Sequence, residues 1–279
     1  MSFQDSFKQN FINDNRWKFI VIGLRNTLVI TVFALLLGLI LGFIIAVVRA
    51  TYDLTGKNNI LNYYKKRRRQ LKQLKQKSET ASGTTANKPS GSPTFIASFV
   101  LILECGWHFL VSSLAKLYTT LIRGTPIVLQ LMIIYYIIFS TVNVDKVFAA
   151  ILAFGINSGA YVSEIFRGGI MSIDTGQMEA GRSLGLNYFQ TMWRIVMPQA
   201  VKNVLPAIGN EFITLLKETS VAGYIAIQDL TRGADIIRSR TYQPFFPLLG
   251  AAAIYLVLVM ILQAGVGKLE RRLAKSDRR

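Results

Sequence analysis

The sequence predicts an all-α fold, a polytopic transmembrane helix bundle with about five spanning helices. Hydrophobic residues make up 51% of the 279 residues, and they gather in long runs that are nearly free of charge. Short strands of alternating polarity, which would indicate a membrane barrel, are not the pattern here. A net charge of +17 would suggest nucleic-acid binding in a soluble chain. Because Lys and Arg are segregated from the apolar runs, membrane topology explains this charge and we expect no nucleic-acid partner.

The apolar runs define the expected spans. Residues 27–48 contain no charged side chain and are long enough to cross a hydrocarbon core of about 30 Å. This run exceeds the apolar region of a signal peptide and is followed by no small-residue cleavage pattern, so we expect a retained helix. Four further runs lie at about 117–140, 147–166, 203–227 and 245–266.

Positive charge sets the expected sidedness. Residues 57–77 carry nine Lys and Arg and no acidic residue, and residues 268–279 carry six basic residues against two acidic ones. Both should lie in the cytoplasm, which five spans allow if the N-terminus is outside and the C-terminus inside. The expected divisions are an extracytoplasmic segment (1–22), a transmembrane domain (23–267) and a basic cytoplasmic tail (268–279). Within the domain we expect a basic insert at about 57–110 and a cytoplasmic loop at about 170–200.

The insert has three parts. Its basic stretch has the helical pattern of a segment that lies on anionic membrane lipids. Residues 79–93 are small and polar with two prolines, which is typical of a flexible connector. Residues 94–115 are long enough to cross the membrane, but a sixth crossing would put one basic region outside, so we expect an interfacial or re-entrant segment or a lead-in to the next span. Glu104 and His108, one helical turn apart, are expected to form a polar pair within it.

The loop between the third and fourth runs carries the strongest functional pattern. Asp174 with Gln177, and Asn187 with Gln190, have the spacing of two N-terminal capping boxes, which predicts two short helices. Gly185 should end the first helix and Pro198 should stop the second. Phe189, Met192, Trp193 and Val196 share one face of the second helix. Such a helix pair is suited to dock into a groove of a partner, although packing on lipid headgroups would produce a similar pattern.

This loop resembles the EAA loop of the permease subunits of bacterial ABC importers. The matching residues are Glu179, Ala180, Gly181, Gly185, Ile195 and Pro198, with Gly181 in place of the usual third-position alanine and Met197 in place of leucine. Three further segments resemble the polar amino-acid subfamily in the same order: RGTP at 123–126, GAY at 159–161 with Glu164 and FRGGI at 166–170, and KETS at 217–220. The length between the first run and RGTP departs from that pattern.

The resemblance implies a division of labour between subunits. It implies a pair of ATP-binding subunits that bind the EAA loop, a second permease copy or paralogue, and an extracytoplasmic binding protein that delivers a polar amino acid. The six EAA-loop residues are implied to couple ATP hydrolysis to alternating access, the small ones by permitting close approach to the ATPase and Glu179 by a polar contact. The chain itself contains no G-x-x-x-x-G-K-[ST] phosphate loop.

Polar residues inside the apolar runs are candidates for the substrate path, because polar groups are expensive in a membrane. We expect them at near-helical spacing in the third and fourth runs. Glu211 could meet the ammonium group of a zwitterion, while Lys217 or the start of the helix after Pro126 meets the carboxylate. An internal ion pair that holds the bundle together is an equal alternative for Glu211, and Arg123 is expected to reach the cytoplasmic interface. The candidates are Asn157, Tyr161, Glu164, Asn210, Glu211 and Thr214.

Other classes of protein fit less well. One Cys and one His cannot build a usual zinc site or an internal disulfide. We expect no catalytic cluster, metal or cofactor, and hence no enzyme. An ion-coupled secondary transporter or channel remains the alternative, because Glu164 and Glu211 lie inside apolar runs.

Overall fold

The computed structural model describes residues 2–55, 69, 107 and 110–276, and all regular structure in those residues is helical. The chain forms two compact units, Met1–Ile44 with Thr119–Arg279, and Ile45–Tyr118. The expected basic stretch, the connector, most of 94–115 and the Glu104–His108 pair lie outside the described residues.

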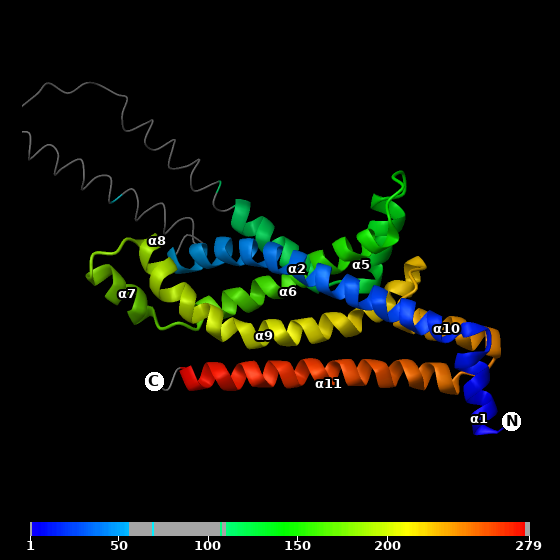
Figure 1. Cartoon of the computed structure of the whole chain (residues 1–279). Coiled ribbons are helices and arrows are strands. Elements are labelled where there is room, and N and C mark those ends of the chain that lie inside the picture. Colours follow the sequence, from blue (N-terminus) through cyan, green and yellow to red (C-terminus); the bar gives the residue numbers. More distant parts are fainter. Residues whose placement is uncertain (1, 56–68, 70–106, 108–109, 277–279) are drawn as a thin grey trace, which may run out of the picture. The chain divides into compact units, whose positions relative to one another are not determined.

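Figure 1 shows the order of the described helices along the chain. A short N-terminal group precedes the first long helix, and a bent helix pair precedes α6. A loop of short helices then joins α6 to α9. The elements are α1 (Phe3–Phe7), η1 (Lys8–Ile12), η2 (Asn13–Asn15), α2 (Trp17–Thr55), a helix at Leu110–Arg123, α5 (Ile127–Ile133), η3 (Ile134–Ile138), α6 (Lys146–Met171), α7 (Thr175–Ser183), α8 (Tyr188–Thr191), η4 (Met192–Val196), α9 (Met197–Glu218), η5 (Thr219–Ile225), α10 (Leu230–Thr241) and α11 (Phe245–Ser276).

Among the described residues, three helices are long and apolar enough to cross a membrane: Trp17–Arg49, Lys146–Met171 and Phe245–Lys275. A fourth span is formed if Leu110–Arg123 and Ile127–Ile138, which meet at 107°, count as one. All four overlap the predicted runs. The remaining run, predicted at 203–227, falls on α9 and η5, where the α-helix ends earlier, at Glu218.

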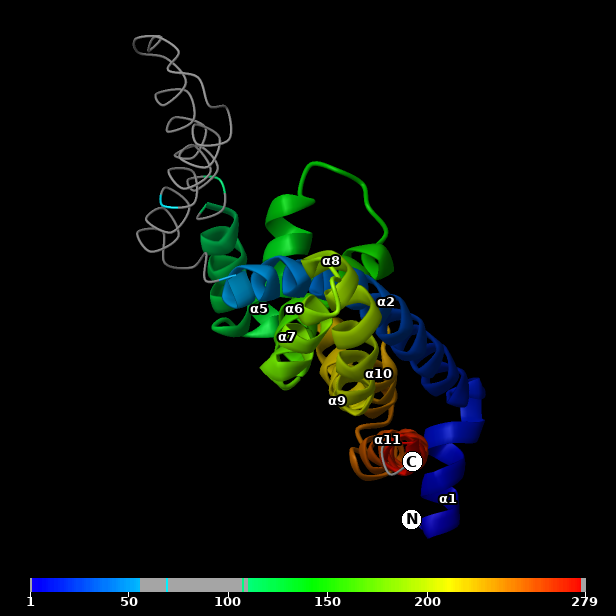
Figure 2. The ribbon, with the colours of Figure 1, turned by 90° about the vertical axis from the view of Figure 1, so that its left-hand side faces the viewer.

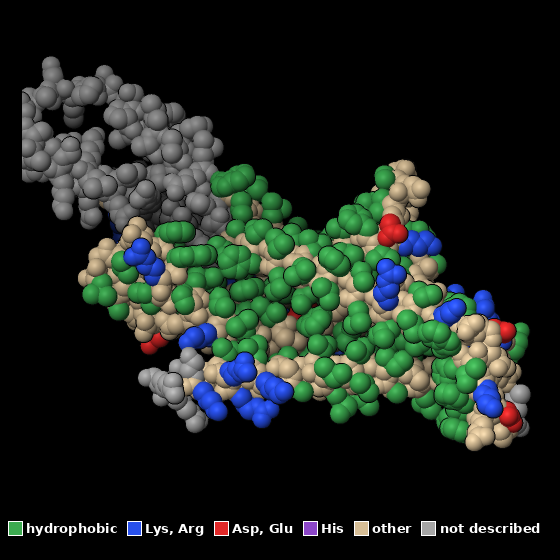
Figure 3. All heavy atoms as spheres, in the orientation of Figure 1, with side chains coloured by type: hydrophobic (Ala, Val, Ile, Leu, Met, Phe, Trp, Pro, Cys, Tyr) green, Lys and Arg blue, Asp and Glu red, His purple; other side chains and the backbone are tan. Residues whose placement is uncertain are grey.

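Apolar side chains point outward on the longest helices, as lipid contact requires. On α2 these include Phe33 and Ile40, and on α11 Leu256 and Met260, all more than half exposed. Figure 3 shows hydrophobic side chains over the middle of this face and Lys and Arg near both ends. This banded distribution is what a bilayer selects.

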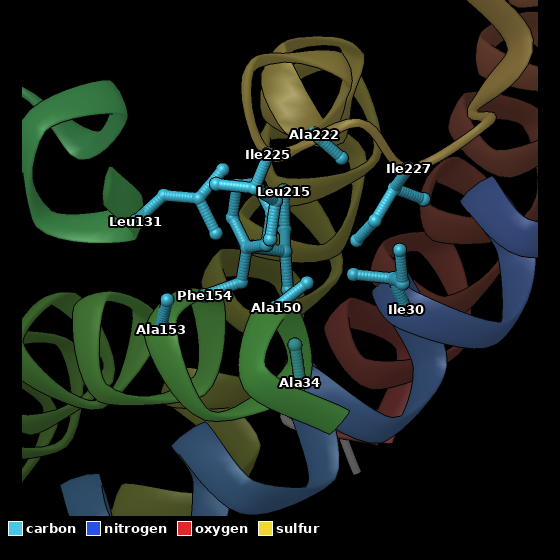
Figure 4. Close-up of a cluster of buried hydrophobic side chains, with 10 residues drawn as sticks. All are labelled: Ile30, Ala34, Leu131, Ala150, Ala153, Phe154, Leu215, Ala222, Ile225 and Ile227. Carbon is cyan, nitrogen blue, oxygen red and sulfur yellow. The ribbon is translucent and has the colours of Figure 1, made fainter. Parts of the chain in front are cut away.

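The core lies where α2, α5, α6, α9 and η5 meet (Figure 4). Small residues of α2 and α6, among them Ala34, Ala150 and Ala153, are fully buried, and Phe154 fills the space between them and Leu215. In a membrane, helices associate by close packing rather than by leaving water, so small residues at the contact favour the assembly. α6 packs on α9, and α9 packs on α11 (Figures 1 and 2).

A second cluster joins the start of α2 to α10 and α11, around Leu230, Ala234 and Ile237. The N-terminal group is fixed to the same end through the buried Asn10. Its Nδ2 donates to Gln243 Oε1 at 2.7 Å, and its Oδ1 accepts from Thr241 Oγ1 at 2.9 Å. The α10–α11 turn therefore holds the segment that leads into the first span.

Candidate functional site

The loop between α6 and α9 contains the two predicted helix starts. Asn187 and Gln190 form the predicted capping box, with Asn187 Oδ1 accepting from the backbone N–H of Gln190 at 2.8 Å and Gln190 Oε1 accepting from that of Asn187 at 3.0 Å. At α7 the cap differs from the prediction. Asp174 Oδ1 accepts from the backbone N–H of Gly176 at 2.8 Å and does not form a reciprocal box with Gln177. A carboxylate can cap at either of the first free N–H groups, so the spacing alone did not decide the partner.

The reversal after α7 occurs at Gly185, as predicted. Its φ of +82° lies in the left-handed region. The backbone N–H of Leu186 donates to the carbonyl of Gly181 at 3.1 Å, and that of Gly185 donates to the carbonyl of Arg182 at 3.0 Å. This pair of bonds is a Schellman motif, which ends a helix and satisfies its last carbonyls.

The prediction that Pro198 stops the second helix is wrong. α8 continues through the π-helical turn η4 into α9, and Pro198 lies in the first turn of α9. Proline lacks an N–H and clashes with the preceding turn of a regular α-helix, but a wider π turn just before it relieves both problems. The side-chain Nε2 of Gln199 donates to the carbonyl of Ile195 at 2.8 Å. The loop is thus joined to α9 by a continuous helix.

Gly181 faces the following helix of the same chain. A Cβ at this position would lie 2.5 Å from Thr191 Cγ2, 2.9 Å from Thr191 Oγ1 and 3.1 Å from Ile195 Cδ1. Thr191 is fully buried, and its Oγ1 donates to the carbonyl of Asn187. The departure from alanine at 181 is therefore matched by a β-branched side chain opposite. The close approach that Gly181 permits is between α7 and α8.

The other EAA-like residues lie mainly at the surface. Glu179, Ala180, Gly185 and Pro198 are exposed, and Ile195 is partly buried. The predicted apolar face is divided, because Val196 is buried whereas Phe189 and Trp193 are 73% and 60% exposed. The rings of Phe189 and Trp193 are stacked with an interplanar angle of 2°, and Leu184, at the end of α7, is 79% exposed. The loop thus presents exposed apolar side chains, Leu184, Phe189 and Trp193, which are called its apolar surface below, and Glu179 is exposed on α7.

The three candidates on α6 face the break between Arg123 and α5. Asn157 Nδ2 donates to Gln130 Oε1 at 2.9 Å. The Arg123 guanidinium lies 5.3 Å from the centre of the Tyr161 ring, and its Nη1 is 3.9 Å from Glu164 Oε1. Arg123, predicted to reach the cytoplasmic interface, also contacts this polar face of α6.

The three candidates on α9 separate into two groups. Glu211 is buried and its Oε1 accepts from Ser158 Oγ of α6 at 2.9 Å. Asn210 and Thr214 are exposed, as is Lys217, and their spacing puts them on one face of α9. That face leads to a cavity of about 360 Å³ between α9, η5, α10 and α11, lined by Lys217, Ser220, Thr231, Ala234, Leu248, Ala251, Ala252 and Tyr255.

A second cavity of about 320 Å³ adjoins the first, since both are lined by Ser220, Thr231 and Leu248. It adds Asp229, Arg232 and Asp235, so it contains charges of both signs. Burial raises the pKa of the Asp229 carboxyl to about 6, although the backbone N–H groups of Arg232 and Thr231 donate to it and lower that pKa. Within the described residues no group of three or more His, Cys, Asp or Glu side chains is arranged to hold a metal ion.

Comparison with known proteins decides the family. Residues 94–275 match the model of the inner membrane component of binding-protein-dependent transport systems. The chain belongs to this family. It is therefore a permease of the bacterial inner membrane, as the EAA-like loop and the apolar helices predicted.

Relatives agree with this assignment. The arginine transport system permease protein ArtQ of Bacillus subtilis is 46% identical over 167 residues, which cover 59% of this permease and 76% of the relative. The glutamine transport system permease protein GlnP of Escherichia coli is 36% identical over 171 residues, or 60% and 77% of the two chains. A crystal structure of an amino acid ABC transporter with histidines has a TM-score of 0.69 at 31% identity and covers 98% of this chain and 99% of its own.

Two residues of the site, Gln130 and Thr191, were not predicted from the permease sequence. Gln130 is a polar residue within an apolar run, which is the signal that selected its partner Asn157. Thr191 gave no signal, because its role comes from contact with Gly181 across the turn.

Proposed function

We propose that this permease forms half of the path for a polar amino acid, and that a separate pair of ATP-binding subunits drives it by alternating access. The observation that carries the proposal is the loop of α7 and α8. It joins two core helices, α6 and α9, without a flexible linker on the α9 side, and it presents an apolar surface at its outer end.

The loop is suited to receive force from a partner. Leu184, Phe189 and Trp193 offer an aromatic and aliphatic anchor of the kind that dominates binding energy at protein interfaces. Glu179 and Ala180 lie on the preceding helix, where a carboxylate can pair with a basic group of the ATPase. Gly181, Gly185 and the helix through Pro198 hold the two short helices in one geometry. Glu179, Ala180, Gly185, Ile195 and Pro198 are thus proposed as coupling residues, with Gly181 acting inside the loop.

The path for the amino acid is proposed along the exposed face of α9. Asn210 and Thr214 would offer hydrogen bonds, and Lys217 at the cavity between α9, α10 and α11 would meet the carboxylate of a zwitterion. Glu211 would act from behind this face by fixing α9 to α6 through Ser158. The names of relatives, which are arginine and glutamine permeases, support a polar amino acid as the substrate.

The proposed assembly contains a second permease copy or paralogue and an extracytoplasmic binding protein. A path along the exposed face of one helix needs a second wall, which a partner permease would supply. The family description requires a binding protein for delivery.

Reconstitution tests the proposal. The complete transporter, with its ATP-binding subunits and binding protein, is placed in proteoliposomes, and uptake of labelled arginine and glutamine is measured with and without enclosed ATP. Uptake that needs ATP and is unaffected by collapse of ion gradients is expected. Uptake by the permease alone, driven by a proton or sodium gradient, would instead establish the secondary-transporter alternative.

A further inference from the structure

The break between Leu110–Arg123 and α5 is fastened internally by one side chain. A bend of 107° at a proline removes helical hydrogen bonds and leaves backbone carbonyls without donors. Gln130 Nε2 lies 2.7 Å from the carbonyl of Ile122, 3.0 Å from that of Thr125 and 2.7 Å from Thr125 Oγ1. Thr125 Oγ1 in turn donates to the carbonyl of Leu121 at 2.8 Å. These hydrogen bonds therefore hold the bend in one conformation.

Two sets of side-chain contacts, called the inner and outer layers here, join the same break to α6. Asn157, Tyr161 and Glu164 are spaced by four and three residues, so they lie on one helical face. The inner layer is neutral and buried, because Asn157 donates to Gln130. The outer layer is charged and partly exposed, with Arg123 over the Tyr161 ring and beside Glu164.

In the charged layer, the two contacts of Glu164 with arginine differ in length. Glu164 Oε2 accepts from Arg167 Nε at 3.1 Å within α6, whereas Arg123 Nη1 reaches Glu164 Oε1 at 3.9 Å from the other element. The longer contact is near the limit for an ion pair, so a small displacement of α6 is enough to make or lose it. The Tyr161 ring can hold the guanidinium nearby while the carboxylate distance changes.

Glu164 is also close along the chain to the loop between α6 and α9 (172–196), called the coupling loop from here on. It lies seven residues before the end of α6 at Met171, which is about 10 Å of helix. Only Ser172, Ile173 and Asp174 then separate α6 from α7. A helix of this kind transmits a displacement of α7 to the turn that carries Glu164.

We propose that Asn157, Tyr161 and Glu164 are positioning residues that join the break to α6, and that the Arg123–Glu164 contact transmits movement of the coupling loop to the bent helix. This inference rests on the proposed function, since it needs a loop that an ATPase moves. It assigns the polar face of α6 to coupling, where the sequence suggested substrate contact.

The test uses the complete transporter with Glu164→Gln and Arg123→Gln. The amino acid imported per ATP hydrolysed is expected to fall by about fivefold or more, the size of a typical coupling between sites. Basal ATPase activity and the KM for the amino acid are expected to stay within a factor of about two of wild type, a change under 0.5 kcal/mol. Arg167→Gln is the matched control, because Arg167 contacts the same carboxylate from within α6, and it should preserve the ratio.

Two results would overturn the proposal: an equal loss of coupling in Arg167→Gln, or a raised KM with unchanged coupling in Glu164→Gln, which would place Glu164 in the substrate path. Failure of wild type to import with ATP would instead refute the proposed function.

Cross-linking gives a second measurement that does not depend on activity. Arg123→Cys and Glu164→Cys are combined in a Cys105→Ser background and treated with a short, reducible bis-thiosulfonate reagent. The yield is expected to differ between the nucleotide-free and vanadate-trapped transporter. Equal yields in the two states would contradict a contact that changes during the cycle.

Discussion

Gly181 and Thr191 form a matched pair at the centre of the coupling loop. Gly181→Ala should destabilise the loop by about 1–3 kcal/mol, because the new methyl group meets a buried, hydrogen-bonded threonine at 2.5 Å. Thr191→Ala alone loses one hydrogen bond and some packing. The double variant should be more stable than the sum of the single changes predicts, since the clash is removed. Thermal unfolding of all four proteins in one detergent measures this coupling, and strict additivity would disprove the contact.

A substitution at Gly185 changes the backbone strain without a steric clash, because a Cβ there would meet no atom within 4 Å. Gly185→Val should cost about 1–2 kcal/mol from its φ of +82° and reduce ATP-driven uptake. Gly185→Asn should cost less, since asparagine tolerates the left-handed region. Equal uptake by the two variants would show that this turn does not set the geometry of the loop.

The residues that the sequence predicted correctly are those whose role is local. The capping box at Asn187 and the turn at Gly185 depend on neighbours within four residues. Gly181 and Glu164 depend on partners ten and forty-one positions away. The polar residue types marked α6 as a candidate functional helix. Only the fold shows that its polar face contacts the break between Arg123 and α5.

α10 depends on Asp229, which caps it through the backbone N–H groups of Thr231 and Arg232. The folded-state pKa of about 6 is above the usual 3.8, so the folded protein holds the proton more tightly. This contribution to stability is complete below about pH 3.8 and is lost as the pH rises through about 6. Ionisation therefore costs about 3 kcal/mol at most.

Two variants separate the cap from the charge. Asp229→Asn should keep the cap and make the melting temperature in detergent independent of this group, so that the variant gains on wild type between pH 4 and pH 7. Asp229→Ala should lower the free energy of unfolding by about 1 kcal/mol at both pH 4 and pH 7, because alanine cannot cap α10. If the difference between wild type and Asp229→Asn does not change over this range, the raised pKa is wrong.

At the scale of the element, Pro198 shows that a helix-stop rule based on neighbouring residues can fail. A proline after a short amphipathic helix usually marks its end, and composition gives no sign of a π turn. The π turn is stable here because Val196 and Met197 are buried and Gln199 supplies a donor to Ile195. Tertiary packing thus converts an expected stop into a continuous connection from the loop to α9.

At the scale of the whole molecule, the spans could be predicted because a bilayer imposes length and apolarity on each one. α9 is the exception: it carries Lys202, Glu211, Lys217 and Glu218 and is less apolar than the other spans, although it packs on both α6 and α11. Of these charged residues, Lys217 lines a cavity and Glu211 accepts a hydrogen bond from Ser158 of α6. The divisions at 1–22, 57–110 and 268–279 remain predictions.

Sidedness remains the broadest prediction, and one segment makes it worth testing. With the N-terminus outside, five spans put α10, which lies between the fourth and fifth runs, on the outer side. It carries Arg232, Arg238 and Arg240, which the positive-inside rule alone would place in the cytoplasm. Asp235 pairs with Arg232 and Arg238, so its single negative charge offsets one of these three positive charges. The stretch at 57–77, which has nine basic residues and no acidic one in its sequence, should decide the orientation.

Cysteine labelling distinguishes the two orientations. Tyr242, at the end of α10, is 90% exposed, and Ser183, at the end of α7, is also exposed. In a Cys105→Ser background, Tyr242→Cys should react with a membrane-impermeant maleimide in right-side-out vesicles, whereas Ser183→Cys should react only after the vesicles are opened. Labelling of both after opening confirms that each thiol is accessible. The reverse pattern would put the coupling loop outside, where no ATP-binding subunit could reach it.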